Sequence, residues 1–102
     1  MTHDTVPSFT ASVPTERASR YMQQLAKHWA HKLDVHFDSE RATVTFPIAR
    51  LDMVADAEAL ALTLVPTGDE DISHLKDVVE KHLDRFAFRE GELVYDWQSM
   101  SV

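Results

Sequence analysis

Cysteine is absent from this 102-residue chain, glycine occurs only twice, and no apolar run is long enough to cross a membrane. The lack of cysteine excludes disulfides, thiolate metal sites and cysteine nucleophiles, and it is typical of proteins in a reducing cytosol. Two glycines exclude a glycine-rich phosphate-binding loop. A membrane helix needs about 20 apolar residues, and the opening stretch MTHDTVPSF lacks the basic and apolar segments of a secretory signal. We therefore expect a cytoplasmic protein with no membrane segment.

Positive charge is also scarce, because 10 Lys and Arg stand against 17 Asp and Glu and the net charge is −7. Such a field repels nucleic acid, and no basic stripe with interleaved aromatic residues is present, so no nucleic-acid partner is expected. The apolar content of 44 % is that of an ordinary globular domain. The length corresponds to a single domain, which we place at residues 8–99 between a flexible tail over 1–7 and a short tail over 100–102.

Hydrophobic periodicity predicts a strand, a helix, four strands, a helix and a strand, in that order. The expected elements are a strand at 9–13, a helix from 15 to about 32, four strands between 35 and 64, a helix from a capping box at 67–70 to about 87, and a strand at 93–97. Each strand has one apolar face and each helix has one apolar stripe. The fold class is therefore α+β, with an antiparallel sheet and two helices packed on one face of it.

The number of strands between the two helices bears on how the histidines are placed. Because four strands form a meander, the helices should run in opposite directions, with their basic C-terminal ends at opposite ends of the domain. His28, His31 and His82 are then not expected to converge on one metal. His28 and His31 can share an ion, but zinc needs further ligands and none lies nearby at ligand spacing. We therefore predict no metal site and no cofactor.

Basic residues gather at the end of both predicted helices. The first helix ends in KHWAHK, residues 27–32, and the second carries His82, Arg85 and Arg89 at its end. Unpaired carbonyls make that end of a helix negative, and each cation there stabilises it by roughly 0.3–1 kcal/mol. The alternative is that these clusters bind a ligand. His82 also borders the apolar stripe, so we expect it to be half-buried with a ring nitrogen bonded to backbone or carboxylate.

One side of the first predicted helix is a better candidate for an anion-binding surface. Arg20 lies in the middle of the helix, where the helix dipole does not account for a cation. In an acidic protein a local basic stripe attracts an anionic ligand or an acidic partner, and the alternative is an ordinary solvated helix face. The candidate ligand-binding residues are Arg17, Arg20, Lys27, His28, Trp29 and His31.

Three further polar residues, Asp34, His36 and Asp38, alternate on what should be the open face of the sheet. Carboxylates two residues away favour the imidazolium form of His36, and such a trio can serve acid–base chemistry or bind a hard cation weakly. No nucleophile or oxyanion donor accompanies it, so we assign no catalytic residue, and the alternative is a solvated strand surface.

The same open face is expected to carry small and mildly apolar residues where charge is usual. Such a patch suits a homodimer packed sheet to sheet, or docking of another protein, and the alternative is an ordinary half-apolar surface. Its members are Val54, Ala59, Ala61, Thr63, Val65 and Val94.

Two motifs resemble a bacterial family catalogued as domain of unknown function 2218. The first is Ser19-Arg20-Tyr21 with Leu25, Lys27-His28 and His31-Lys32, and the second is HLDRFAFRE over 82–90. The resemblance covers about 13–97. The family has no established activity, so the resemblance implies no catalytic residue. It does imply a link to iron, because members are sometimes joined to siderophore-interacting ferric reductases.

The residues and the resemblance together favour a small cytoplasmic binding or accessory domain connected with siderophore or iron metabolism. Its expected partners are an anionic small molecule, such as a ferric siderophore, or a ferric reductase. Two alternatives stay open, namely a small enzyme that uses histidine acid–base chemistry and a protein–protein adaptor that forms a homodimer through its open sheet face.

Overall fold

The structure is a computed structural model that describes residues 8–68, 71–90 and 93–100. Its elements follow the predicted order, with one short 3-10 helix added after the second α-helix. They are β1 (Ser8–Pro14), α1 (Ala18–Trp29), β2 (Asp34–Phe37), β3 (Arg41–Thr45), β4 (Ala49–Ala55), β5 (Ala59–Pro66), α2 (Ser73–Phe86), the 3-10 helix η1 (Phe88–Glu90) and β6 (Gln98–Met100). The predicted flexible tail over 1–7 lies outside the described residues.

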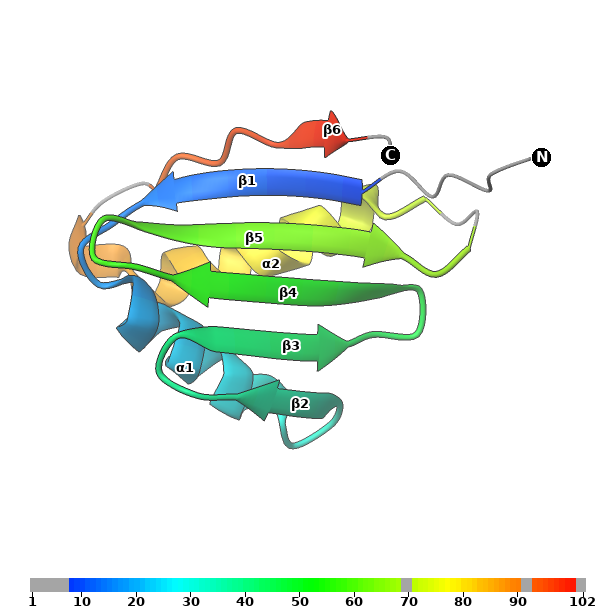
Figure 1. The fold of residues 1–102 in the computed structure, drawn as a ribbon, viewed down its shortest axis with the longest axis horizontal. Coiled ribbons are helices and arrows are strands. Elements are labelled where there is room, and N and C mark those ends of the chain that lie inside the picture. The colour runs from blue at the N-terminus through cyan, green and yellow to red at the C-terminus, as the bar shows by residue number, and fades with distance from the viewer. Residues whose placement is uncertain (1–7, 69–70, 91–92, 101–102) are drawn as a thin grey trace.

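The strands form one six-stranded sheet in the order β2-β3-β4-β5-β1-β6, and every neighbouring pair is antiparallel. Strands β2 to β5 are consecutive hairpins, whereas β1 lies between β5 and β6, with Ala11 opposite Leu62. Figure 1 shows both helices on the far side of this sheet and the near side uncovered. The predicted α+β class, and the packing of both helices on one face, are confirmed.

Two hairpin turns are closed by aspartate side chains. Asp38 Oδ1 accepts hydrogen bonds from the backbone N–H groups of Glu40 and Arg41 at 2.8 and 2.9 Å. Asp56 Oδ1 does the same for Glu58 and Ala59 at 2.7 and 2.8 Å. These bonds stabilise the ionised carboxylates and hold the pKa of Asp38 and of Asp56 below the usual value. Local side-chain bonding therefore fixes the register of these hairpins.

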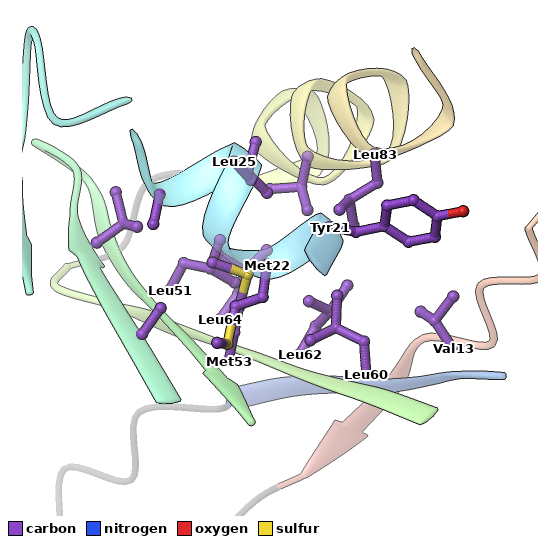
Figure 2. Packing of buried hydrophobic residues seen from close by; sticks show 14 of the residues in the cluster. Val13, Tyr21, Met22, Leu25, Leu51, Met53, Leu60, Leu62, Leu64 and Leu83 are labelled. Carbon is purple, nitrogen blue, oxygen red and sulfur yellow. The ribbon is translucent and has the colours of Figure 1, made fainter. Parts of the chain in front are cut away.

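The core fills the space between the covered face of the sheet and the two helices. Leu62 of β5 and Leu51 of β4 point toward Met22 and Leu25 of α1 and Leu83 of α2 (Figure 2), and all five are fully buried. Burial of a leucine or methionine side chain contributes about 1.5–3 kcal/mol. This apolar contact therefore fixes where both helices lie on the sheet.

The helices run in opposite directions, as predicted (Figure 1). Tyr21, near the start of α1, contacts Glu90 just beyond the end of α2, and His28 in the last turn of α1 contacts His82 in the second half of α2. The end of α1 therefore reaches α2 along its length and not at its far terminus.

The first helix is shorter than predicted, because it ends at Trp29 and not near Lys32. The N–H groups of Lys32 and Leu33 both donate to the carbonyl of Trp29, at 3.0 and 2.8 Å, and this turn redirects the chain into β2. The helix also begins at Ala18, after a turn in which Thr15 Oγ1 accepts the N–H of Arg17 at 3.1 Å. His31 therefore lies in the turn beyond the helix.

The predicted capping box at 67–70 is wrong, because α2 begins at Ser73. The N–H of Thr67 donates to the carbonyl of Ile48 at 3.0 Å, which ties Thr67 to the β3–β4 turn. Asp71 accepts the N–H of Ser73 at 2.9 Å instead. Residues 69 and 70 lie outside the described residues.

The last strand lies later than predicted, at Gln98–Met100, where it pairs with β1. In the predicted strand segment, Tyr95 donates to Asp84 Oδ1 at 3.0 Å, and Trp97 Nε1 donates to Glu80 Oε2 at 2.7 Å. Leu93, Tyr95 and Trp97 are half-buried against the core. For Tyr95 and Trp97 the alternation therefore reflects contact with α2 and not a sheet face.

Among the described residues, no helix combines the length and the apolar character that a membrane crossing requires.

Because Leu62 is fully buried on the covered face, we expect Leu62→Ala to lower the free energy of unfolding by about 2–5 kcal/mol. Val54 lies on the open face and is 43 % exposed, so Val54→Ala should cost less than about 1 kcal/mol. Chemical denaturation of both variants measures the difference. Equal losses would mean that the two sheet faces are equally covered.

Candidate functional site

Glu90 connects the 3-10 helix η1 to the start of α1 through hydrogen bonds. Its carboxylate accepts hydrogen bonds from Thr15 Oγ1, at 3.0 Å to both oxygens, and from the Tyr21 hydroxyl. The Glu90 side chain is only 22 % exposed, and the residues it joins are 75 and 69 positions away. Hydrogen bonds to a charged group contribute about 1.5–3 kcal/mol, so this contact fixes η1 against α1.

Tyr21 has a buried ring, and its hydroxyl donates to Glu90 at the edge of the core. Figure 2 shows its oxygen pointing away from the core. Burial, and then the hydrogen bond to Glu90 and its negative charge, raise the pKa of the Tyr21 phenol above 10.0, so it remains a neutral donor. Arg17 Nη1 lies 4.0 Å from the same carboxylate, and its side chain is 57 % exposed. An ion pair of that kind is weak.

Beside this contact lies a cavity of about 310 Å³, which we call the arginine cavity. It is formed where α1, the end of α2 and η1 meet. Its lining combines cations and aromatic rings, namely Arg17, Arg20 and Arg89 with Phe86 and Phe88, together with Tyr21 and Gln24. Guanidinium groups bind carboxylates, sulfonates and phosphates, and they also stack on aromatic faces.

The charge in the arginine cavity is poorly compensated. Within the described part of the chain, Arg20 and Arg89 form no ion pair with a carboxylate. The Arg89 guanidinium lies 5.6 Å from the centre of the Phe88 ring, and that ring is on a residue 69 % exposed. The cavity can therefore accept an anion, with aromatic surface beside it for an apolar group.

A second cluster brings together residues that were predicted to stay apart. The rings of His28 and His82 have their centres 5.1 Å from each other, so the predicted separation of the two basic helix ends is wrong for this pair. The reason is that α1 crosses α2 along its length. His82 is half-buried and its Nδ1 lies 2.7 Å from the Val78 carbonyl, which confirms the expected backbone bond.

This cluster disfavours the protonated form of His28, although the residue is exposed to solvent. Burial, followed by the positive charge of His82, Arg85, Lys32 and His31, lowers the pKa of His28 below 6.5. The ring also packs edge-on against Phe86, with centres 6.4 Å apart. Because Phe86 lines the arginine cavity, the histidine pair and the cavity share one wall.

Asp34, His36 and Asp38 do not act as one group, because Asp38 lies in the turn that follows β2. His36 Nε2 lies 3.2 Å from Asp34 Oδ1, with side chains 81 % and 72 % exposed. The Asp38 carboxylate bonds the backbone of the β2–β3 turn instead. An ion pair that exposed contributes little.

The remaining candidates are dispersed over the helical layer. Trp29 is buried in the core, where the centre of its ring lies 5.0 Å from that of Phe46 and 5.2 Å from that of His82. Lys27 lines a neighbouring hollow on α1, and Arg85 is exposed in the last turn of α2. Within the described residues, no group of three or more histidines and carboxylates could hold a metal ion.

On the open face, Val54, Ala59, Ala61, Thr63 and Val65 lie on β4 and β5, opposite the buried positions of those strands. Val94 does not belong to this face, because it lies between η1 and β6, where it is 66 % exposed. Polar contacts also cross the face, since Asp52 accepts hydrogen bonds from Thr43 at 3.1 Å and from Arg50 at 3.0 Å. The face is therefore more polar than the predicted apolar patch.

Sequence reasoning missed the partners that complete the arginine cavity. Tyr21 and Gln24 follow Arg17 and Arg20 at helical spacing on one side of α1. Phe86, Phe88 and Glu90 belong to the second motif, HLDRFAFRE. These two signals were present, but only the contact between α1 and η1 shows that they form one site.

Comparisons with known proteins agree with the two motifs. A family model described as an uncharacterised protein conserved in bacteria (DUF2218) matches residues 10–98. The chain is also similar to PA4090 from Pseudomonas aeruginosa, whose structure was determined by NMR. The identity is 33 %, the TM-score is 0.73, and the match covers 89 % of this chain and 94 % of that one. No curated protein matches the chain.

Glu90→Gln should lower the free energy of unfolding by about 1–2 kcal/mol, because bonds to a neutral amide are weaker than bonds to a carboxylate. Glu16→Gln is the matched control, since Glu16 is exposed, and it should change stability by less than about 0.5 kcal/mol. Urea denaturation compares the two. A loss no greater than in the control would show that the Glu90 contact does not hold η1 in solution.

Acidification should destabilise the protein through His28. Its pKa is lower in the folded state than the unfolded value of 6.5, so the unfolded chain takes up the proton first and stability falls as the pH drops below about 6.5. The pKa values of Asp38 and Asp56 are lowered from 3.8. Protonation of these two carboxylates therefore changes the stability only below about pH 4, outside the range of this measurement. Melting temperatures at pH 7.5 and 5.0 measure the loss.

His28→Gln should make that loss smaller, whereas His74→Gln, an exposed position on α2, should leave it unchanged. The same pH dependence in the wild-type protein and in His28→Gln would contradict the role assigned to His28.

Proposed function

This chain belongs to the family of uncharacterised bacterial proteins known as DUF2218, and we propose that it is a binding domain whose ligand is an anionic molecule with an aromatic body. The observation that carries the proposal is the arginine cavity, where Arg17, Arg20 and Arg89 surround the same space as Phe86 and Phe88. Both motifs that mark the family contribute to this lining.

The charge distribution supports an anionic ligand. The chain as a whole has a net charge of −7, yet no acidic residue occurs between Arg17 and Leu33. Glu90 is the carboxylate that pairs with Arg17, and its oxygens are already engaged by Thr15 and Tyr21. An incoming anion would therefore meet guanidinium groups with free hydrogen-bond donors, in a field that is locally positive.

The aromatic residues support a ligand with an apolar ring. Phe86 is half-buried and forms a wall, whereas Phe88 is exposed at 69 %. Aromatic pairs contribute about 0.5–1.5 kcal/mol beyond area burial, and a ring on the ligand would cover the exposed Phe88.

We propose more specifically that the ligand is a ferric siderophore of anionic type. The support is the positive cavity and the link to siderophore-interacting ferric reductases that the family resemblance implies. A cavity of about 310 Å³ is at the small end of the range for ligand pockets, so it suits one aromatic arm of such a ligand and not the whole complex. Cytoplasmic location and docking to a ferric reductase belong to the same proposal.

The two other functions have less support. No histidine is among the described residues that line the arginine cavity, so an enzyme using histidine acid–base chemistry would have to work elsewhere. Homodimerisation through the open sheet face stays a prediction, and gel filtration at high protein concentration tests it.

Calorimetry with biphenyl-4-sulfonate tests the general proposal, because this probe joins aromatic rings to a permanent negative charge. We expect saturable binding, and weaker binding of the neutral biphenyl-4-methanol. Arg89→Met should weaken sulfonate binding by about 10- to 100-fold, the equivalent of a charged hydrogen bond. Arg85→Met is the control, since Arg85 is exposed on α2 outside the cavity, and it should have little effect.

Equal affinity for the sulfonate and the alcohol, or equal effects of the two arginine substitutions, would refute the proposal. The siderophore proposal is tested separately with an anionic ferric tris-catecholate. If the sulfonate binds and the ferric complex does not, the proposal of anion binding is supported and the proposal of a siderophore ligand is refuted.

A further inference from the structure

A second hollow lies on α1 directly beside the arginine cavity. Its volume is about 460 Å³, and it is lined by Ser19, Arg20, Gln23, Gln24 and Lys27. Arg20 and Gln24 also line the arginine cavity. The two hollows therefore share a boundary, and together they follow the outer side of α1 from Arg17 to Lys27.

The second hollow is also positively charged without compensation. Lys27 makes no ion pair with any carboxylate that the structure describes, and neither does Arg20. No acidic residue occurs in the chain between Arg17 and Leu33. Ordinary surface helices balance such charges with carboxylates one turn away, so this side of α1 differs from a typical solvated face.

One wall of the second hollow is held in place by hydrogen bonds. The Ser19 hydroxyl donates to the carbonyl of Ser39, in the β2–β3 turn, and accepts a bond from Gln23 Nε2 at 2.9 Å. Gln23 is therefore oriented by a contact that reaches the sheet. Its amide keeps one further N–H for a ligand.

From this arrangement we propose that the second hollow binds a second anionic group of the same ligand, so that the ligand is an elongated dianion. Arg20 and Lys27 are two helical turns apart, which corresponds to roughly 10 Å along the axis of α1. One anionic group would lie between Arg20 and Arg89 in the arginine cavity, the aromatic body would follow the outer side of α1, and the other anionic group would reach Lys27. This inference rests on the proposed function, because the first group occupies the arginine cavity.

Two probes that differ only in the second charge test the inference. Biphenyl-4-sulfonate fills the arginine cavity alone, and biphenyl-4,4′-disulfonate adds a sulfonate at the far end. We expect the wild-type protein to bind the disulfonate more tightly. Lys27→Met should weaken binding of the disulfonate by about 3- to 10-fold, as expected for one exposed charge-assisted contact. It should leave the affinity for the monosulfonate unchanged. Arg89→Met should weaken both.

Lys81→Met is the control for general loss of positive charge, because Lys81 is exposed on α2 and lines neither hollow. If the disulfonate binds no more tightly than the monosulfonate, or if Lys27→Met and Lys81→Met weaken it equally, the second anionic subsite is refuted. Monosulfonate binding that depends on Arg89 would still uphold the proposed function in that case. Failure of both probes to bind would refute both.

Discussion

The apolar contact between one face of the sheet and the two helices is the constraint from which the other features follow. Leu51, Leu62 and Leu64 must be covered, and Met22 and Leu25 of α1 together with Leu83 of α2 cover them. Because both helices cover the same face, they lie side by side and their outer sides form a common surface. The arginine cavity and the histidine pair both lie on the helical layer where α1 meets α2.

The hydrogen bonds of Glu90 add a polar contact that positions η1 on the helical layer. Glu90 accepts hydrogen bonds from Thr15 and Tyr21, and so it holds η1 against the start of α1. This places Arg89, the preceding residue, beside Arg17 and Arg20. The hydrogen bonds to this carboxylate come from neutral donors, and its ion pair with the Arg17 guanidinium is long, at 4.0 Å. Most of the positive charge of the arginines therefore stays available. A single partly buried carboxylate therefore shapes a cationic site without neutralising it.

The errors of sequence interpretation have a common origin in local signals that tertiary contacts use differently. Leu93, Tyr95 and Trp97 alternate like a strand, yet all three side chains pack against the core. Tyr95 and Trp97 also form hydrogen bonds with Glu80 and Asp84 of α2. KHWAHK continues the helical pattern, yet the chain turns at Trp29 to enter β2. A hydrophobic period of two or of 3.6 residues identifies apolar residues at regular spacing. It does not indicate which surface those residues contact in the folded protein.

The sequence by itself determined the order of the elements, the α+β class and the covered face of the sheet, because these depend on periodicity within short segments. It also indicated Arg17, Arg20 and Arg89 as candidates, on two separate helices. Only the tertiary structure decided that these arginines line one cavity, that His28 meets His82 and that Glu90 reaches Tyr21. The physical reason is that all three contacts depend on where α1 crosses α2, and that position is set by the packing of side chains far apart in the chain.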